Sequence, residues 1–167
     1  KQVVRLGLCE QVLRDLRPTF DAVVHPWLLE HQKQQFATSG RHGGKPWAPL
    51  TGEPKYAGMK RALGASMAPL RWKPGRQERL YPSLTQSRHP LHRWQAGKAR
   101  ASFGTSVKYA DRLQKGGKGP KGERFPPRVM FAYTNAQVRD LVRAMQRDIL
   151  RRVGGDSFRS ARNAGTL

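Results

Sequence analysis

Histidine, cysteine and acidic side chains are the residues with which this chain could do metal or acid–base chemistry. His89 and His92 lie three positions apart, but Pro90 falls between them, and no carboxylate completes a spacing typical of a metal site. Cys9 is the only cysteine, so neither an intramolecular disulfide nor a thiolate cluster can form. The 11 acidic residues show no pair spaced for general acid and base catalysis. The sequence therefore predicts no catalytic residue, no metal site and no cofactor.

Basic side chains dominate the remaining chemistry. The chain has 32 Lys and Arg residues against 11 Asp and Glu, a formal net charge of +21, and such an excess favours nucleic acid, an acidic protein ring or an anionic membrane as partner. One group of arginines recurs at i+4 spacing, and a second basic group lies in a glycine-rich loop. These candidate DNA- or partner-facing residues are Arg139, Arg143, Arg147 and Arg151 in the first group, and Lys115, Lys118, Lys121 and Arg124 in the second. Each group is equally well interpreted as a solvated surface; if it contacts phosphates, it would position DNA without reading its sequence.

Apolar periodicity predicts the helices that must carry these groups. Apolar residues at helical spacing indicate amino-terminal helices over residues 3–17 and 26–36, and a short helix over residues 56–68. Thr134 and Gln137 form a capping box at the start of an amphipathic helix, which Gly154 and Gly155 would end. The predicted apolar face of that helix consists of Val138, Leu141, Val142, Met145, Ile149 and Val153.

A strict alternation predicts the sheet. Phe103, Thr105, Val107 and Tyr109 would share one face of a strand over residues 98–109. Residues 91–94 would pair with it across a turn at 95–97, and residues 129–133 would make one more short strand. Residues 69–90, with four prolines, are expected to be mostly irregular. The predicted fold class is α+β: amino-terminal helices, a small antiparallel β-sheet with a long basic loop, and a carboxy-terminal amphipathic helix.

The predicted organisation is one α+β domain over residues 1–153, followed by a flexible tail over residues 154–167. Within the domain we expect a helical arm (1–36), an irregular region with a short helix (37–97), a β-hairpin region (98–133) and the last helix (134–153).

A succession of short motifs runs through residues 36–153. It consists of Phe36, Gly43 and Gly44, Trp47, Pro49 and Leu50, Lys60, Gly104 and Thr105, Tyr109 and Ala110, Gln114, Gly116, Pro126, Arg128 and Phe131. This order of features resembles the virion morphogenesis or tail-completion family of tailed bacteriophages, found in Mu-like and P2-like phages. The chain departs from the family pattern at Leu113, where the family commonly has His, and in a longer and more basic loop. The family-motif core residues are then Trp47, Leu50, Gly104, Thr105, Tyr109, Ala110, Pro126, Arg128 and Phe131, with Tyr109 and Phe131 as anchors.

The resemblance implies a structural virion protein without enzymatic activity. Such a protein would act at the phage head–tail junction as a tail-completion, neck or head–tail connector protein, in an oligomeric ring of six or twelve copies around the DNA channel. Its partners would be copies of itself, the neighbouring neck, portal-adaptor, tail-terminator or tail-tube proteins, and packaged double-stranded DNA. Its expected location is the virion, after assembly in the host cytoplasm. No membrane partner is expected, because no apolar run approaches the roughly 20 residues that span a bilayer.

Two functions of other classes stay open at this point. One is a nonspecific DNA-binding protein that works as a monomer or dimer. The other is a basic nuclease whose carboxylates, Asp111 or Glu123, would hold a metal ion.

Overall fold

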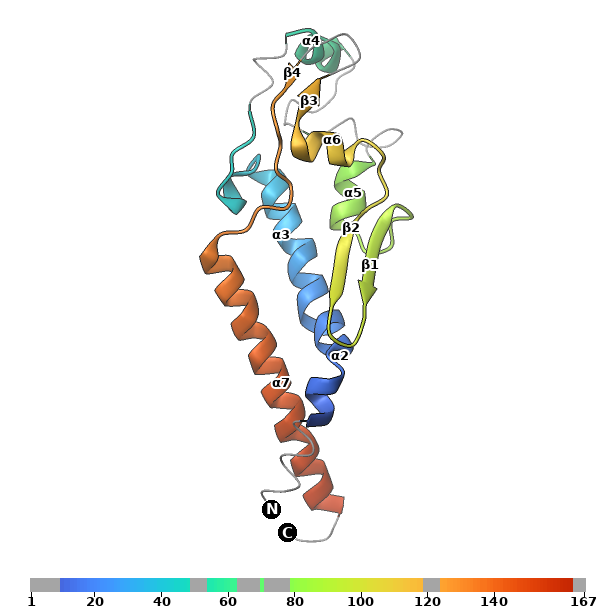
Figure 1. The fold of residues 1–167 in the computed structure, drawn as a ribbon, viewed down its shortest axis with the longest axis vertical. Coiled ribbons are helices and arrows are strands. Elements are labelled where there is room, and N and C mark those ends of the chain that lie inside the picture. Colours follow the sequence, from blue (N-terminus) through green and yellow to red (C-terminus); the bar gives the residue numbers. More distant parts are fainter. Residues whose placement is uncertain (1–9, 49–53, 63–69, 71–78, 119–123, 164–167) are drawn as a thin grey trace. The chain divides into compact units, whose positions relative to one another are not determined.

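The computed structural model describes residues 10–48, 54–62, 70, 79–118 and 124–163. Helices and short antiparallel strands both occur, so the α+β class is confirmed (Figure 1). After a helical stretch at residues 10–14, the elements are α2 (Arg17–Thr19), the π-helical turn η1 (Phe20–Val24), α3 (His25–Ala37), the 3-10 turn η2 (Arg41–Gly43), α4 (Pro54–Ala62), α5 (Leu80–Thr85), β1 (His92–Ala96), β2 (Ala101–Thr105), α6 (Ala110–Lys115), β3 (Gly117–Lys118), β4 (Arg124–Phe125) and α7 (Asn135–Asn163).

The chain forms two compact units, and each is discontinuous in sequence. Unit 1 combines Lys1–Trp27, Trp94–Ser102 and Asn135–Leu167, whereas unit 2 combines Leu28–Arg93 and Phe103–Thr134. In unit 1 the first and last segments lie more than 100 positions apart, whereas the two segments of unit 2 are separated only by the hairpin tip at residues 94–102. The single-domain organisation expected from the sequence stays a prediction.

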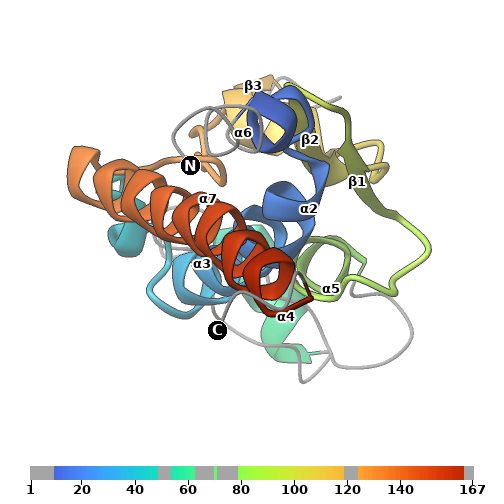
Figure 2. The same cartoon turned by 90° about the horizontal axis from the view of Figure 1, so that it is seen from below.

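In unit 1, α7 packs against α2 and η1 (Figures 1 and 2). The tip of the β1–β2 hairpin joins the same unit. The indole Nε1 of Trp94 donates to Asp21 Oδ1 over 2.7 Å, its ring stacks on His25 with centroids 4.5 Å apart, and Leu16 N donates to Lys98 O over 2.9 Å.

The amino-terminal helices differ from the prediction in where they break. Residues 15 and 16 are not helical, and helix then continues from Arg17 to Ala37 through α2, η1 and α3. Pro18 was expected to end a helix, but it lies in the first turn of one, where its missing N–H costs no hydrogen bond. The helix predicted over 26–36 is confirmed as part of α3, and the predicted residues 3–9 lie outside the described residues.

The predicted end of the last helix is wrong. α7 begins directly after Thr134 as expected, but it continues through Gly154 and Gly155 to Asn163. A glycine costs about 1 kcal/mol relative to alanine inside a helix, yet it permits helical dihedrals. Gly154 does not adopt the left-handed conformation that would end the helix. Residues 154–163 are accordingly helical, whereas a flexible tail was predicted for them.

The core of unit 2 is apolar and draws on α3, α5, α6 and the segments between elements. It consists of Phe36, Trp47, Leu80, Leu84, Val107, Ala110 and Met130. Two of these residues belong to α5, a helix inside the segment that was predicted to be mostly irregular. Leu80 and Leu84 lie one turn apart and are both buried, while Pro82 occupies the first turn, where no helical N–H bond is needed. The burial of Leu80 and Leu84 therefore stabilises a helix in a segment whose prolines favour irregular structure.

The β1–β2 hairpin is confirmed, but its turn lies further along the chain than predicted. Backbone bonds of 2.8 Å join Gly97 N to Arg100 O and Ser106 N to Leu91 O, which together set an antiparallel register. Residues 97–100 form the turn, in place of residues 95–97. In this register one face carries His92, Trp94, Phe103 and Thr105, and the other carries Arg93, Gln95, Ser102 and Gly104.

The second strand ends four residues earlier than predicted. Thr105 Oγ1 accepts a hydrogen bond from Val107 N over 3.1 Å as the chain leaves β2. Val107 and Ala110 then enter the core, but Tyr109 is 46% exposed. The prediction of Tyr109 as a core anchor is therefore wrong, because the alternation ends where the strand does.

The long basic loop begins and ends on a second, very short antiparallel pair. In β3 and β4, Gly117 is paired with Phe125 and Lys118 with Arg124. Residues 119–123 between them lie outside the described residues. The small sheet of the prediction is thus two separate two-stranded pairs.

Candidate functional site

The predicted arginine ladder lies on the outward side of α7. All four arginines are exposed, and at about 100° per residue they cover an arc of about 120° on the helix surface. The centre of the arc lies between Arg143 and Arg147. Besides arginine it carries Asp140 and Leu150. We call Arg139, Arg143, Arg147 and Arg151 with this arc the arginine face.

The packed side of α7 combines a buried carboxylate with part of the predicted apolar face. The side chain of Asp148 is 2% exposed. Four members of the predicted apolar face are half-buried, namely Leu141, Met145, Ile149 and Val153, whereas Val138 and Val142 are each 46% exposed. Asp148 therefore marks the direction in which α7 packs within unit 1.

Three donors hold the Asp148 carboxylate. Thr19 Oγ1 donates to Oδ2 over 2.9 Å, and Arg152 Nε donates to the same oxygen over 2.7 Å. Arg151 Nη2 donates to Oδ1 over 2.5 Å. Burial raises the pKa of Asp148, but the hydrogen bonds from Arg152, Arg151 and Thr19 outweigh burial and hold the pKa below its ordinary value.

The four ladder arginines differ in their carboxylate partners. Arg151 is bonded to Asp148, although its own side chain is 76% exposed. Arg143 lies 3.7 Å from Asp140, and both side chains are 67% exposed. Arg139 and Arg147 have no carboxylate partner among the described residues. Within the described residues, Arg139 and Arg147 are therefore cations without a counter-ion, whereas Arg143 and Arg151 each contact an aspartate.

Of the loop residues predicted to meet a polyanion, only the side chain of Lys115 is described. It is exposed and lies 2.8 Å from an oxygen of Asp111 one helical turn earlier. Lys118 and Arg124 contribute backbone to β3 and β4. Their side chains, and Lys121 and Glu123, lie outside the described part of the chain. The ladder belongs to unit 1 and the loop to unit 2.

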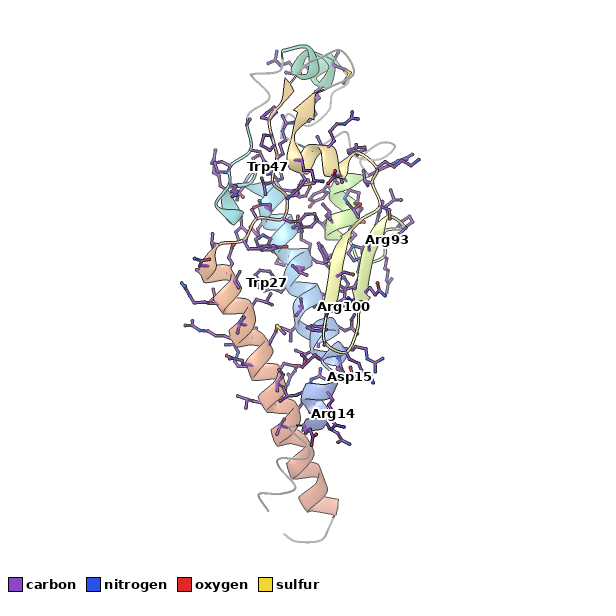
Figure 3. The ribbon with its side chains drawn as sticks, viewed as in Figure 1. Arg14, Asp15, Trp27, Trp47, Arg93 and Arg100 are labelled. Atoms are coloured by element: carbon purple, nitrogen blue, oxygen red, sulfur yellow. The ribbon has the colours of Figure 1, made fainter. Side chains whose placement is uncertain are left out.

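The family-motif residues gather in unit 2 around one extended stretch, residues 128–132, which we call the central segment. Trp47 Nε1 donates to Val129 O over 3.0 Å (Figure 3), and Gln114 Oε1 accepts from Met130 N over 2.6 Å. Phe131 packs against the core, as predicted. The side chain of Arg128 is buried, and the backbone N–H of Arg128 donates to Leu113 O over 2.8 Å.

The remaining motif residues are spread around this centre. Gly43 passes so close to the central segment that an added Cβ would lie 2.3 Å from Ala132 O. Ala110 and Lys60 are buried, and Thr105 Oγ1 lies 2.7 Å from Ser83 Oγ. Of the family-motif core residues, Tyr109 is exposed and Leu50 lies outside the described residues; those that are half-buried are Gly104, Thr105, Pro126 and Phe131.

The strand predicted over 129–133 is wrong, because side chains of α3 take the place of a partner strand. Gln32 Nε2 donates to Met130 O over 3.2 Å and Gln35 Nε2 to Val129 O over 3.0 Å. Gln35 Oε1 also accepts from Gly43 N over 2.6 Å, so this amide joins three segments. Sequence reasoning missed these residues. The sequence offers one indication of their role: the polar residues His31, Gln32 and Gln35 share the buried side of α3 with Phe36.

His31 completes this row on α3. Its Nε2 lies 3.0 Å from Ala132 O; because a carbonyl only accepts, Nε2 carries the proton and donates. The ring lies 4.7 Å from that of His42 and 4.6 Å from that of Tyr133. Burial lowers the pKa of His31, as does the neighbouring His42, while the bond to Ala132 opposes them. These contacts join α3 to the central segment and to η2.

Within the ranges that the structure describes, no three His, Cys, Asp or Glu residues lie close enough together to hold a metal ion. No helix in the same ranges is long and apolar enough to cross a bilayer.

Comparison with known proteins adds no identification. No protein-family model matches the sequence, and no curated protein or solved structure shows significant similarity to it.

Proposed function

We propose that this chain is a structural protein of a phage head–tail junction, a tail-completion, neck or head–tail connector protein that assembles as a ring of identical subunits around the DNA channel. The proposal starts from the order of motifs along residues 36–153, and one structural observation carries it further. Motif residues that are far apart in sequence, among them Trp47, Gln114 and Arg128, meet around the central segment. Their succession thus corresponds to one packed unit.

The charge distribution supports a role beside a polyanion. The chain has a net charge of +21, and the arginine face of α7 is exposed. Copies of so basic a chain repel one another in a ring, and the phosphates of DNA in the channel would offset that repulsion.

The nuclease alternative gains no support from the described carboxylates. Asp111 is exposed and its ion-pair partner is Lys115; within the described residues it belongs to no group of three acidic, histidine or cysteine residues that could hold a metal ion. The DNA-binding alternative does gain a specific observation, the arginine face, and DNA binding is developed below as a property of the ring subunit.

Electron microscopy of the purified chain and of the virion neck tests the proposal. We expect averaged particles to show closed rings of six or twelve copies, and the neck map to contain the same subunit between head and tail. Uniform monomers at every concentration, together with metal-dependent cleavage of DNA that Asp111→Asn abolishes, would instead establish the nuclease function.

A further inference from the structure

The arginine face of α7 has the composition of a phosphate-binding surface. Four guanidinium groups follow one another at i+4 spacing, which places them about 6 Å apart along the helix axis and about 18 Å from first to last. Within this arc the only acid is Asp140 and the only large apolar side chain is Leu150. The surface is therefore cationic along its length.

The two paired arginines can still reach an external phosphate. The contact between Arg143 and Asp140 is long, 3.7 Å, and both groups are mostly in water, so it stabilises the chain little. Arg151 is bonded to Asp148, but Asp148 retains Arg152 and Thr19 as donors when Arg151 turns outward. Both arginines can thus exchange a carboxylate for a phosphate.

A duplex fits this surface better than an acidic protein does. B-form DNA presents about one charge per 1.7 Å of its axis, so a row of cations finds phosphates in any register. A protein partner would have to place carboxylates opposite each arginine, and it would also need an apolar centre to its interface. The centre of the arc lies between Arg143 and Arg147 and is cationic.

We propose that the arginine face of α7 binds double-stranded DNA through its phosphates, without sequence preference. The inference rests on the proposed function only in one respect, namely that the bound DNA lies in the channel of the ring. Arg139 and Arg147 contribute most, because no carboxylate of the described residues has to be displaced from them.

Fluorescence anisotropy with two labelled 24-bp duplexes of unrelated sequence tests this inference on the full chain. The variant is Arg139→Gln with Arg147→Gln, and the matched control is Arg41→Gln with Arg88→Gln. The control residues are also exposed and lack a carboxylate partner among the described residues, but they lie in unit 2. Both double variants lower the net charge by the same amount, and circular dichroism confirms that each keeps its helix content.

We expect the wild type to bind both duplexes equally. The α7 variant should weaken binding about tenfold or more at low salt and flatten the slope of log K against log salt by about 1.8, since each lost phosphate contact removes about 0.9. The control variant should change the slope much less. Equal losses in the two variants, a preference between the duplexes, or tighter binding to polyglutamate than to DNA would each overturn the inference.

The inference and the proposed function fail separately. Rings in micrographs without any DNA affinity would refute only the arginine face as a DNA site. DNA affinity that depends on α7 in a chain that never forms rings would refute only the head–tail junction proposal.

Discussion

Asp148→Asn removes the charge of the carboxylate that fastens α7 to the amino-terminal helices within unit 1. The variant keeps the shape of the side chain but can no longer accept hydrogen bonds on two charged oxygens. Arg151 and Arg152 lose their counter-ion, and Thr19 loses its charged acceptor. A measurable loss of stability should follow.

The size of the loss can be bounded from the geometry. A hydrogen bond to a charged group contributes about 1.5–3 kcal/mol, and removal of one partner from a buried ion pair costs about 3–5 kcal/mol. Arg151 is 76% exposed and Arg152 is 30% exposed, so hydration of both cations offsets much of the lost interaction with the carboxylate. We therefore expect the free energy of unfolding to fall by about 2–3 kcal/mol, out of a total of about 5–15 kcal/mol typical of folded proteins.

Urea unfolding followed by far-ultraviolet circular dichroism measures this difference, because α7 supplies much of the helix signal. In a thermal scan the same loss corresponds to a Tm lower by about 4–12 °C. Asp140→Asn is the matched control on the same helix. Its contact with Arg143 is long and exposed, so we expect a change below about 0.5 kcal/mol.

The effect of Asp148→Asn must also depend on pH. Because the pKa of Asp148 is lowered on folding, its stabilising contribution is complete above the pKa of the unfolded carboxyl, about 3.9. The contribution is lost as the pH falls through the lower, folded pKa. The wild type and the variant should accordingly approach each other in stability below about pH 4. Equal losses for Asp148→Asn and Asp140→Asn at pH 7, or a difference that persists unchanged in acid, would refute the role assigned to Asp148.

Three further predictions concern the contacts of the central segment. Gly43→Ala should destabilise the protein by more than about 2 kcal/mol in urea unfolding, since its Cβ would overlap Ala132 O, whereas Gly104→Ala, with open space around it, should be close to neutral. Gln35→Leu should cost about 2–3 kcal/mol by the same measurement, because Gly43 N loses its acceptor in a buried site. His31→Gln should reduce the loss of stability between pH 7 and pH 5: the folded chain disfavours protonated His31, so the wild type is destabilised as the pH falls through about 6.5.

A neighbouring residue provides the control for Gln35→Leu. Gln34→Leu changes an exposed amide whose partner is Glu30, and it should cost less than about 0.5 kcal/mol. If Gln34→Leu is as harmful as Gln35→Leu, or if His31→Gln leaves the pH dependence of stability unchanged, the assignments on α3 are wrong.

The features that could be predicted from the sequence are those whose cause is local. The helix over 26–36 follows from apolar spacing, and the alternation of Phe103 and Thr105 against Ser102 and Gly104 correctly predicts the faces of β2. The exposure of the four arginines on α7 also follows from helical geometry alone.

The features that could not be predicted depend on partners far along the chain. Residues 129–133 have the composition of a strand, but side chains of α3, nearly 100 positions earlier, occupy their backbone groups. The orientation of α7 follows Asp148, whose partner Thr19 lies 129 positions away; the sequence between them carries no sign of that bond. Glycines such as Gly154 and Gly155 often follow the end of a helix, but glycine only weakens a helix. Because the preceding turns of α7 are already formed, the helix continues through both residues.

The discontinuity of unit 1 has a consequence for how the chain must be made. Thr19 leaves the ribosome 129 residues before Asp148, which at about 5–20 residues per second is a delay of about 6–26 s. During that time Phe20, which is buried in the finished protein, has no α7 to pack against, and the last residue of unit 2, Thr134, is made before any part of α7. Synthesis thus imposes an order in which unit 2 can fold first and α7 closes unit 1 last. Translation speed and chaperones that bind apolar segments would then decide how many chains reach the assembly site correctly folded.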